Sequence, residues 1–136
     1  MIKFMNNFYE IDEIGKMELL SNLNCYSSLE EFKVEEYSIT IGINSTDENQ
    51  AKNLHKYIHL ILNQITSFDS NAKDKLKELY NPTKRELEEI KVNHIDFYIN
   101  KDFDLLYNLP EGSPMEYLTI KFSEHGKIID SGGVNY

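Results

Sequence analysis

Apolar and polar residues alternate most regularly in the segment YSITIGI, from Tyr37 to Ile43. A two-residue period is typical of a strand that buries one face, so this segment predicts a half-buried strand. After it the period changes, and apolar side chains recur every three or four residues as far as Ile65. This spacing predicts a helix from residue 46 to about residue 67, with Thr46 or Ser45 at its start and acidic residues in its first turn.

A second helical pattern follows in the segment SFDSNAKDKLKELYNP, residues 67–82. Asp69 or Ser70 is expected to cap its N-terminus, and Leu76 and Leu79 lie on one side of it. Pro82 ends it, because proline disfavours helical backbone in the residue before it and lacks an N–H group. Two consecutive helices are therefore predicted for the middle of the chain.

Strand-like segments surround these helices on both sides. Residues 2–11 precede them, while residues 16–23 are short and equally compatible with a strand or a turn of helix. After the helices come residues 90–100, residues 101–109, a turn at 111–114 and a hairpin at 115–136. Strands that do not alternate with helices favour an α+β fold: a mostly antiparallel sheet with two consecutive central helices packed on one face. A length of 136 residues suits a single domain, 1–136.

Charge is the clearest global property of the chain, with a formal net charge of −9. Residues 1–50 alone hold three Lys against ten Asp and Glu. Such a surface repels a phosphate backbone, which disfavours nucleic-acid binding, and it speeds association with a basic protein. The alternative is that the charge serves only to keep the protein in solution.

Targeting signals and membrane segments are not expected. No stretch approaches eighteen apolar residues, and the N-terminal segment has no apolar core of signal-peptide length. The single cysteine, Cys25, excludes an internal disulfide and suits a reducing compartment. We therefore expect a cytoplasmic protein that does not interact with membranes.

His55 and His59 are the candidate metal ligands, because a spacing of four residues places them on one side of a helix. The metalloprotease pattern needs a Glu between two such histidines, but Lys56 occupies that position here. Both histidines also lie at the margin of the apolar stripe rather than within a ligand-like spacing. We expect ordinary boundary residues and neither metal nor cofactor, with a small metal-binding or hydrolytic domain as the alternative.

Two further features have weak catalytic signals. Cys25 has no neighbouring cationic group to lower its pKa, so a structural thiol is expected rather than a nucleophile. Gly132 and Gly133 lack the Lys and Ser or Thr of a phosphate-binding loop, so they predict a turn-forming terminus. No catalytic residue is predicted.

Acidic residues recur as pairs, at 30–31, 35–36, 86–89 and 101–104. Their ordinary role is to solvate a surface, but some alternate with aromatic residues, as protein interfaces often do. The predicted partner-binding residues are Glu35, Glu36, Tyr37, Asp102, Phe103, Asp104 and Tyr107.

One resemblance adds to these inferences. The second half of the chain is expected to contain paired helices, then a Glu-rich stretch, then an antiparallel meander with a Gly turn. The segments that match this order are Leu79–Asn81, Glu86–Ile90, Ile95–Ile99 and Tyr117–Ile128. Over about residues 46–130 this order resembles a group of small bacterial domains associated with immunity proteins of toxin systems. The resemblance implies a protein that binds a cognate toxin domain, and it implies no catalytic residues.

The leading hypothesis is therefore a non-enzymatic immunity protein that occludes the active site of a basic toxin domain, for example a nuclease. The metal-dependent alternative would use His55 and His59. A third alternative is a structural or oligomeric adaptor that uses an edge strand, which allows a homodimer.

Overall fold

The computed structural model describes residues 8–20, 22–28, 30–109 and 117–134. The predicted turn at 111–114 and the first part of the strand predicted at 2–11 lie outside these residues. The strands are β1 (Phe8–Ile11), β2 (Gly15–Leu20), β3 (Cys25–Ser28), β4 (Phe32–Val34), β5 (Tyr37–Ile43), β6 (Lys91–Phe97), β7 (Phe103–Asn108), β8 (Tyr117–Phe122) and β9 (Ile128–Val134). The helices are α1 (Glu48–Asn53), α2 (His55–Leu62), α3 (Ile65–Tyr80) and α4 (Lys84–Glu89).

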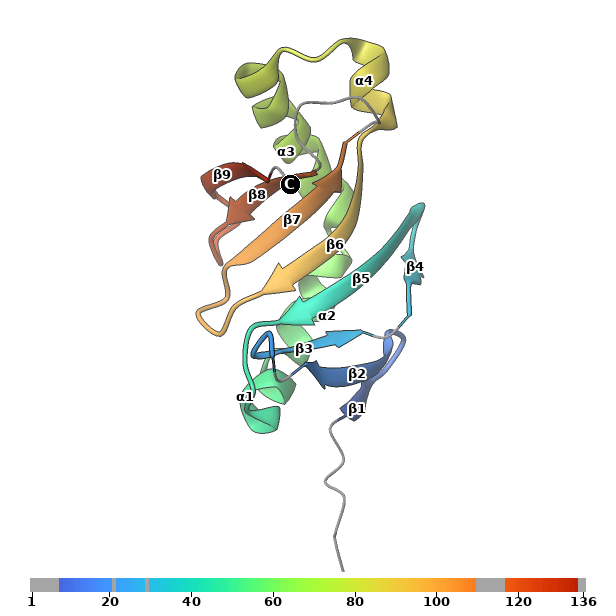
Figure 1. Ribbon diagram of the computed structural model, residues 1–136, viewed down its shortest axis with the longest axis vertical. Coiled ribbons are helices and arrows are strands. Elements are labelled where there is room, and N and C mark those ends of the chain that lie inside the picture. The colour runs from blue at the N-terminus through green and yellow to red at the C-terminus, as the bar shows by residue number, and fades with distance from the viewer. Residues whose placement is uncertain (1–7, 21, 29, 110–116, 135–136) are drawn as a thin grey trace, which may run out of the picture.

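Within the described residues, the strands form one sheet in the order β1-β2-β3-β5-β6-β7-β8-β9, with β4 paired to β5 (Figure 1). Neighbouring strands are antiparallel except β5 and β6, which are parallel. A parallel pair cannot be joined by a tight turn, and the four helices lie in the connection between these two strands. The predicted α+β fold with a mostly antiparallel sheet is confirmed.

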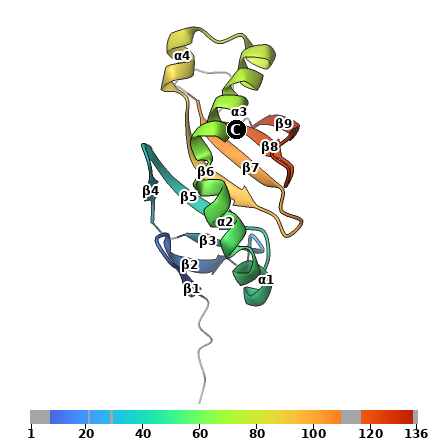
Figure 2. The same cartoon turned by 180° about the vertical axis from the view of Figure 1, so that it is seen from behind.

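The helices α2 and α3 run across one face of the sheet, as Figure 2 shows. Alternate strand residues point toward them and are buried, including Ile39, Ile41 and Ile43 of β5. Phe68 of α3 packs edge-on against the stacked rings of Phe103 and Phe122, at centroid distances of 5.0 and 5.3 Å. No described element covers the opposite face of the sheet (Figure 1).

The first predicted helix is divided in the structure. Asp47, rather than Thr46 or Ser45, caps α1 by accepting hydrogen bonds from the N–H groups of Asn49 and Gln50. The helix is interrupted at Leu54, between α1 and α2, and again after Leu62. The next helix, α3, begins at Ile65. The periodicity was nevertheless informative, since the predicted apolar stripe is buried: Ala51, Leu54, Ile58, Ile61, Leu62 and Ile65.

The predicted start of the second helix at Asp69 or Ser70 is wrong. Asp69 lies inside α3 with only 5% of its surface exposed, so its carboxylate serves the core instead of capping a helix. The predicted end is confirmed, because α3 stops at Tyr80, Asn81 adopts the left-handed conformation with φ of 45°, and Pro82 follows. The helix α4 was not predicted; Thr83 and Glu86 form its capping box.

No helix among the described residues is long and apolar enough to cross a membrane.

Candidate functional site

The buried carboxylate of Asp69 joins three elements of the fold. Its Oδ1 accepts a 2.6 Å hydrogen bond from the hydroxyl of Tyr107 on β7, and its Oδ2 accepts a 2.7 Å bond from Tyr37 on β5. Lys73, one turn later on α3, places its Nζ 3.4 Å from Oδ2. Burying a carboxylate is costly unless it is paired and hydrogen-bonded, and here both conditions are met.

The two tyrosines stay protonated because of this arrangement. Burial raises the pKa of Tyr107 far above its ordinary value, and the charge of Asp69 raises it further. Burial is also the largest cause of the raised pKa of Tyr37, followed by its hydrogen bond to Asp69. Both hydroxyls therefore donate permanently to the carboxylate. This cluster has the features of a structural hydrogen-bond network rather than of a catalytic acid–base pair.

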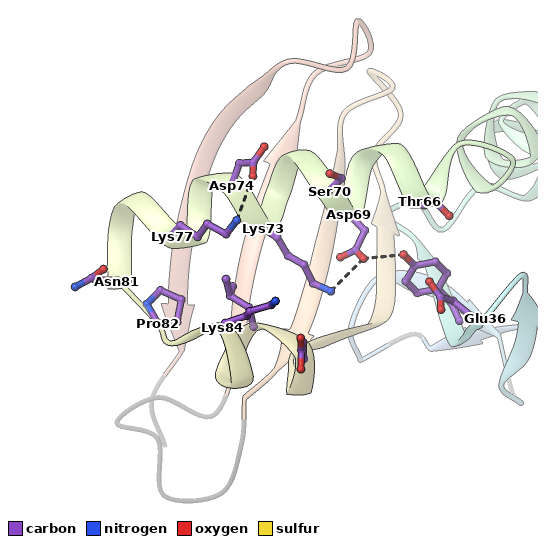
Figure 3. A pocket seen from close by; sticks show the side chains of 13 residues that line it. Glu36, Thr66, Asp69, Ser70, Lys73, Asp74, Lys77, Asn81, Pro82 and Lys84 are labelled. Atoms are coloured by element: carbon purple, nitrogen blue, oxygen red, sulfur yellow. Dashed lines mark hydrogen bonds and ion pairs between the residues drawn. The ribbon is translucent and has the colours of Figure 1, made fainter.

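A groove lies between α3, α4 and the start of β5, with Asp69 at its base (Figure 3). It encloses about 740 Å³, within the range of small-molecule and peptide sites. Figure 3 shows Lys73 reaching toward Asp69 and Lys77 toward Asp74, so two of its cations are already paired. The remaining lining residues include Glu36, Thr66, Ser70, Lys84, Leu87 and Glu88.

The uncovered face of the sheet carries a row of carboxylates. Register places Gly42, Asp96, Asp104, Lys121 and Asp130 opposite one another in turn, across β5, β6, β7, β8 and β9. On the other side of Gly42 the row continues through β3 to Glu18 on β2. We call the five charged members the acidic row: Glu18, Asp96, Asp104, Lys121 and Asp130. With four carboxylates and one ammonium group, it makes this face electronegative.

Asp104 is the most constrained member of the acidic row. Its Oδ2 accepts a hydrogen bond of 2.5 Å from the hydroxyl of Tyr98, and the Nζ of Lys121 lies 4.3 Å from the centroid of the Tyr98 ring. Burial raises the pKa of the Asp104 carboxyl, with Asp96 and Asp130 adding to the increase. The negative charge of Asp104 therefore has an energetic cost, which the hydrogen bond from Tyr98 and the charge of Lys121 offset only in part.

Beside the row, a hydroxyl, an imidazole and a carboxylate lie in sequence. Thr40 Oγ1 is 2.6 Å from His94 Nδ1, and His94 Nε2 is 2.7 Å from Asp96 Oδ1. Gly42 makes room for them, because a Cβ there would lie 2.5 Å from Asp96 Oδ1 and 3.2 Å from His94 Nε2. The order is that of a catalytic triad, but the N–H groups of a central strand are used in sheet pairing and are not free to stabilise an oxyanion. The arrangement orients Asp96.

The seven predicted partner-binding residues do not form one surface. Phe103 and Tyr107 are fully buried beneath the helices and Tyr37 is buried, so none of these three is an exposed anchor. Glu35 and Glu36 are exposed at the turn from β4 to β5. Asp102 lies in the turn from β6 to β7, and of the seven residues only Asp104 belongs to the acidic row.

The sequence patterns did not mark Asp69, Asp96 or Asp130 as site residues, and Asp69 was expected only to cap a helix. The partial alternation within residues 90–100 is compatible with Asp96 and Tyr98 sharing a face, but it does not identify a site there. The sequence could not predict which residue of β7 lies opposite Asp96, because a bulge between Val92 and His94 shifts the register of β6. Nor could periodicity show that an aspartate inside a helix would be satisfied by tyrosines 32 and 38 residues away.

The two histidines of the metal alternative have other surroundings. The ring of His55 stacks on Tyr9 at 5.3 Å, and its Nε2 is buried without a hydrogen-bond partner in the described part of the chain. Burial lowers the pKa of His55, and His59 and Lys52 lower it further. Across residues 8–20, 22–28, 30–109 and 117–134, no three His, Cys, Asp or Glu side chains gather closely enough to hold a metal ion.

Cys25 and the C-terminal glycines lie in strands of the sheet and show no sign of a catalytic or phosphate-binding role. Cys25 is half-buried in β3, and burial raises the pKa of its thiol, with Asp96 contributing. Gly132 and Gly133 lie within β9, opposite Thr119 and Leu118, rather than in the predicted turn. A raised thiol pKa disfavours the thiolate that a nucleophilic cysteine needs.

The edge strand β9 has two features that protect an edge from further pairing. Ile129 is an extra residue in the pairing with β8, because Lys121 faces Asp130 while Phe122 faces Ile128. The carboxylate of Asp130 also accepts a 2.8 Å hydrogen bond from the N–H of Ser131. Bulges and charged side chains are common means of protecting sheet edges, so β9 gives no support to an edge-strand adaptor.

Comparisons with models of protein families, with curated proteins and with solved structures found no significant match to this chain.

Proposed function

We propose that this chain is a non-enzymatic binding protein: an immunity protein that neutralises a basic toxin domain, for example a nuclease, by covering its active site. The acidic row on the uncovered sheet face is the observation that carries this proposal. Unlike the seven residues expected from the sequence, its members share one face and are held in register by hydrogen-bonded strands. We place the protein in the cytoplasm, where such a toxin domain would act.

Two physical arguments support a partner on this face. Asp96 and Asp104 stand directly opposite each other, and like charges in that position destabilise a sheet. A cationic surface docked over them would remove the repulsion. The net charge of −9 would also accelerate the encounter, because long-range attraction steers a basic partner toward an electronegative face.

The mechanism follows from this arrangement. Charge brings the basic domain to the acidic row, and its Lys and Arg side chains then pair with Asp96, Asp104 and Asp130. A rigid sheet face laid over a substrate cleft excludes the substrate, so inhibition needs no chemistry from this chain. The groove at Asp69 takes no part in it.

The test is the rate of association with a basic toxin domain, sought first among the products of genes that neighbour the gene for this chain. Stopped-flow measurements should show an association rate constant that falls about tenfold or more between ~20 mM and ~300 mM salt. The triple variant Asp96→Asn, Asp104→Asn, Asp130→Asn should associate more slowly at low salt and lose most of this dependence.

A matched control removes three carboxylates elsewhere. The variant Asp12→Asn, Glu13→Gln, Glu78→Gln has the same total charge, and all three positions are exposed and outside the acidic row. It should keep nearly the wild-type rate and should still protect cells that express the toxin. Equal effects of the two triple variants, or an association rate independent of salt, would contradict the proposal.

A further inference from the structure

We propose that the opening between β5 and β6 binds an extended, cationic peptide segment of another protein. We call this place the β5–β6 opening; it is bordered by Tyr37 and Ser38 of β5, by Lys91–Asn93 of β6, and by Glu36 and Glu88. It is a second binding site, separate from the acidic row, and does not depend on the identity of the toxin.

The opening exists because the two parallel strands diverge toward their N-terminal ends (Figure 1). Their pairing begins with Thr40 opposite His94 and continues to Ile43 opposite Phe97. Within the described residues, no pairing joins Tyr37–Ile39 to Lys91–Asn93. The space left between the strands encloses about 470 Å³, and Asp69 and Lys73 of α3 are among its lining residues.

Asn93, which borders the opening, has an unused hydrogen-bond acceptor. It is the extra residue of the bulge in β6 and has no counterpart in β7. Its side-chain Oδ1 is buried and has no partner in the described part of the chain. Buried acceptors are almost always hydrogen-bonded, and leaving one unpaired is costly. If the side chain turned toward the opening, which Asn93 borders, an N–H group of a ligand would satisfy this acceptor.

Charge selects the kind of ligand. The residues lining the opening carry four carboxylates, on Glu36, Asp69, Glu88 and Glu89, against the ammonium groups of Lys73 and Lys91. Asp69 already pairs with Lys73, and Glu89 pairs with Arg85 at 3.4 Å. The carboxylates of Glu36 and Glu88 are exposed, and no ion pair joins them to another residue in the described part of the chain. A Lys or Arg side chain of the ligand would supply the missing positive charge.

An extended peptide combines both requirements. Its backbone supplies N–H groups at the spacing of a strand, and its alternate side chains point toward opposite sides. Peptides of this kind bind sheets by adding a strand, where main-chain hydrogen bonds give affinity and side-chain pockets give specificity. The diverging ends of β5 and β6 present strand backbone for this purpose, with Glu36 and Glu88 beside it.

The probe is a seven-residue peptide with acetylated and amidated ends, Lys-Val-Lys-Thr-Lys-Val-Lys, added to the ¹⁵N-labelled protein. Chemical-shift changes should be largest for the amides of Tyr37–Ile39 and Lys91–Asn93. The Glu36→Gln, Glu88→Gln variant should weaken binding about fivefold or more, since two ion pairs are lost. Asn93→Leu, which removes the acceptor, should also weaken it.

Control peptides and variants make the result decisive. Replacing every Lys by Glu, or methylating the N–H groups of the peptide backbone, should abolish binding. The exposed control pair Glu13→Gln, Glu78→Gln should leave binding unchanged. Thermal unfolding of each variant shows whether it keeps its fold.

The outcomes separate this site from the acidic row. Absence of binding at ~1 mM peptide, equal binding of the Glu peptide, or no effect of the Glu36 and Glu88 changes would overturn the proposal. So would loss of peptide binding only in the Asp96→Asn, Asp104→Asn, Asp130→Asn variant, a result that would leave the acidic row as the binding face. Peptide binding that survives this triple variant supports the β5–β6 opening, whatever the toxin experiment shows.

Discussion

Asp96 and Asp104 face each other across the antiparallel strands β6 and β7, on the side of the sheet that no described helix covers. Their repulsion costs stability and serves the proposed binding face. We expect Asp96→Asn to raise the free energy of unfolding at pH 7.5 by about 0.2–0.5 kcal/mol, because it removes this repulsion. The amide is nearly isosteric with the carboxylate, so the packing should not change. Urea unfolding measures this, with the exposed Asp12→Asn as control. A loss of about 1 kcal/mol would contradict it.

Asp104 should make stability depend on pH. Because its pKa is raised in the folded protein above the ordinary 3.8, the folded state holds this proton more strongly than the unfolded state. The contribution of Asp104 to stability therefore falls as pH rises from 3.8 through the raised value. Urea unfolding of wild type and Asp104→Asn over this range should show the extra decline only in wild type. Parallel curves would refute the assignment.

Asp69 should be the most sensitive polar position of the core. Asp69→Ala removes a buried acceptor of two tyrosine hydroxyls and leaves both unpaired, so we expect a loss of about 3 kcal/mol. Tyr107→Phe removes one of these bonds and should cost about 1–3 kcal/mol. Chemical unfolding provides the measurement. The exposed Asp74→Ala on the same helix should change stability by at most about 0.5 kcal/mol, and a similar effect of both alanine variants would be unexpected.

A side chain at position 42 is expected to be incompatible with the present position of Asp96. Gly42→Ala would force Asp96 away from His94 and break their 2.7 Å contact, at a cost of about 1 kcal/mol. In an Asp96→Ala background the same change should cost less, giving a coupling energy of about 0.5 kcal/mol or more. A double-mutant cycle tests this. Gly132→Ala, where the nearest atom is 3.4 Å away, serves as the comparison, and purely additive effects would argue against the contact.

His55 should make the folded protein less stable as the pH is lowered. Its pKa is lowered below the ordinary 6.5, so the unfolded state binds this proton more strongly. The stabilising contribution is present above pH 6.5 and is lost as pH falls through the folded-state pKa. Unfolding of wild type and His55→Phe between about pH 7.5 and pH 5 should reveal a steeper decline in wild type. The 86% exposed side chain of His125 offers the control, His125→Gln, which should behave like wild type.

Sequence patterns predicted those parts of the fold that depend on neighbouring residues. The strand Tyr37–Ile43, the end of α3 at Tyr80 and the hairpin of β8 and β9 agree with their periodicity and turn signals. The breaks between α1, α2 and α3 were missed, because apolar spacing continues across Leu54 and Asn63. In the same way, a buried Asp69 and a capping Asp69 have the same local sequence.

The candidate site was harder to predict, since it depends on which strands are neighbours. Asp104 was identified among acidic and aromatic residues, but its partners Asp96, Lys121 and Asp130 become neighbours only through the pairing of β6, β7, β8 and β9. Phe103 and Tyr107 alternate with Asp104, so they belong to the opposite, buried face of the same strand. In a strand with one buried face, an acid and an adjacent aromatic residue cannot both be surface anchors.

The acidic row crosses the parallel pair of β5 and β6, and this has a consequence for the newly made protein. Glu18 comes from the part of the chain before the helices, whereas Asp96, Asp104 and Asp130 come from the part after them. The two parts meet only once residues 48–90 have been made and placed, and such long-range pairing forms slowly. A chain still on the ribosome, or one truncated before β9, would lack the complete row. Binding through that face would thus select finished molecules over incomplete ones.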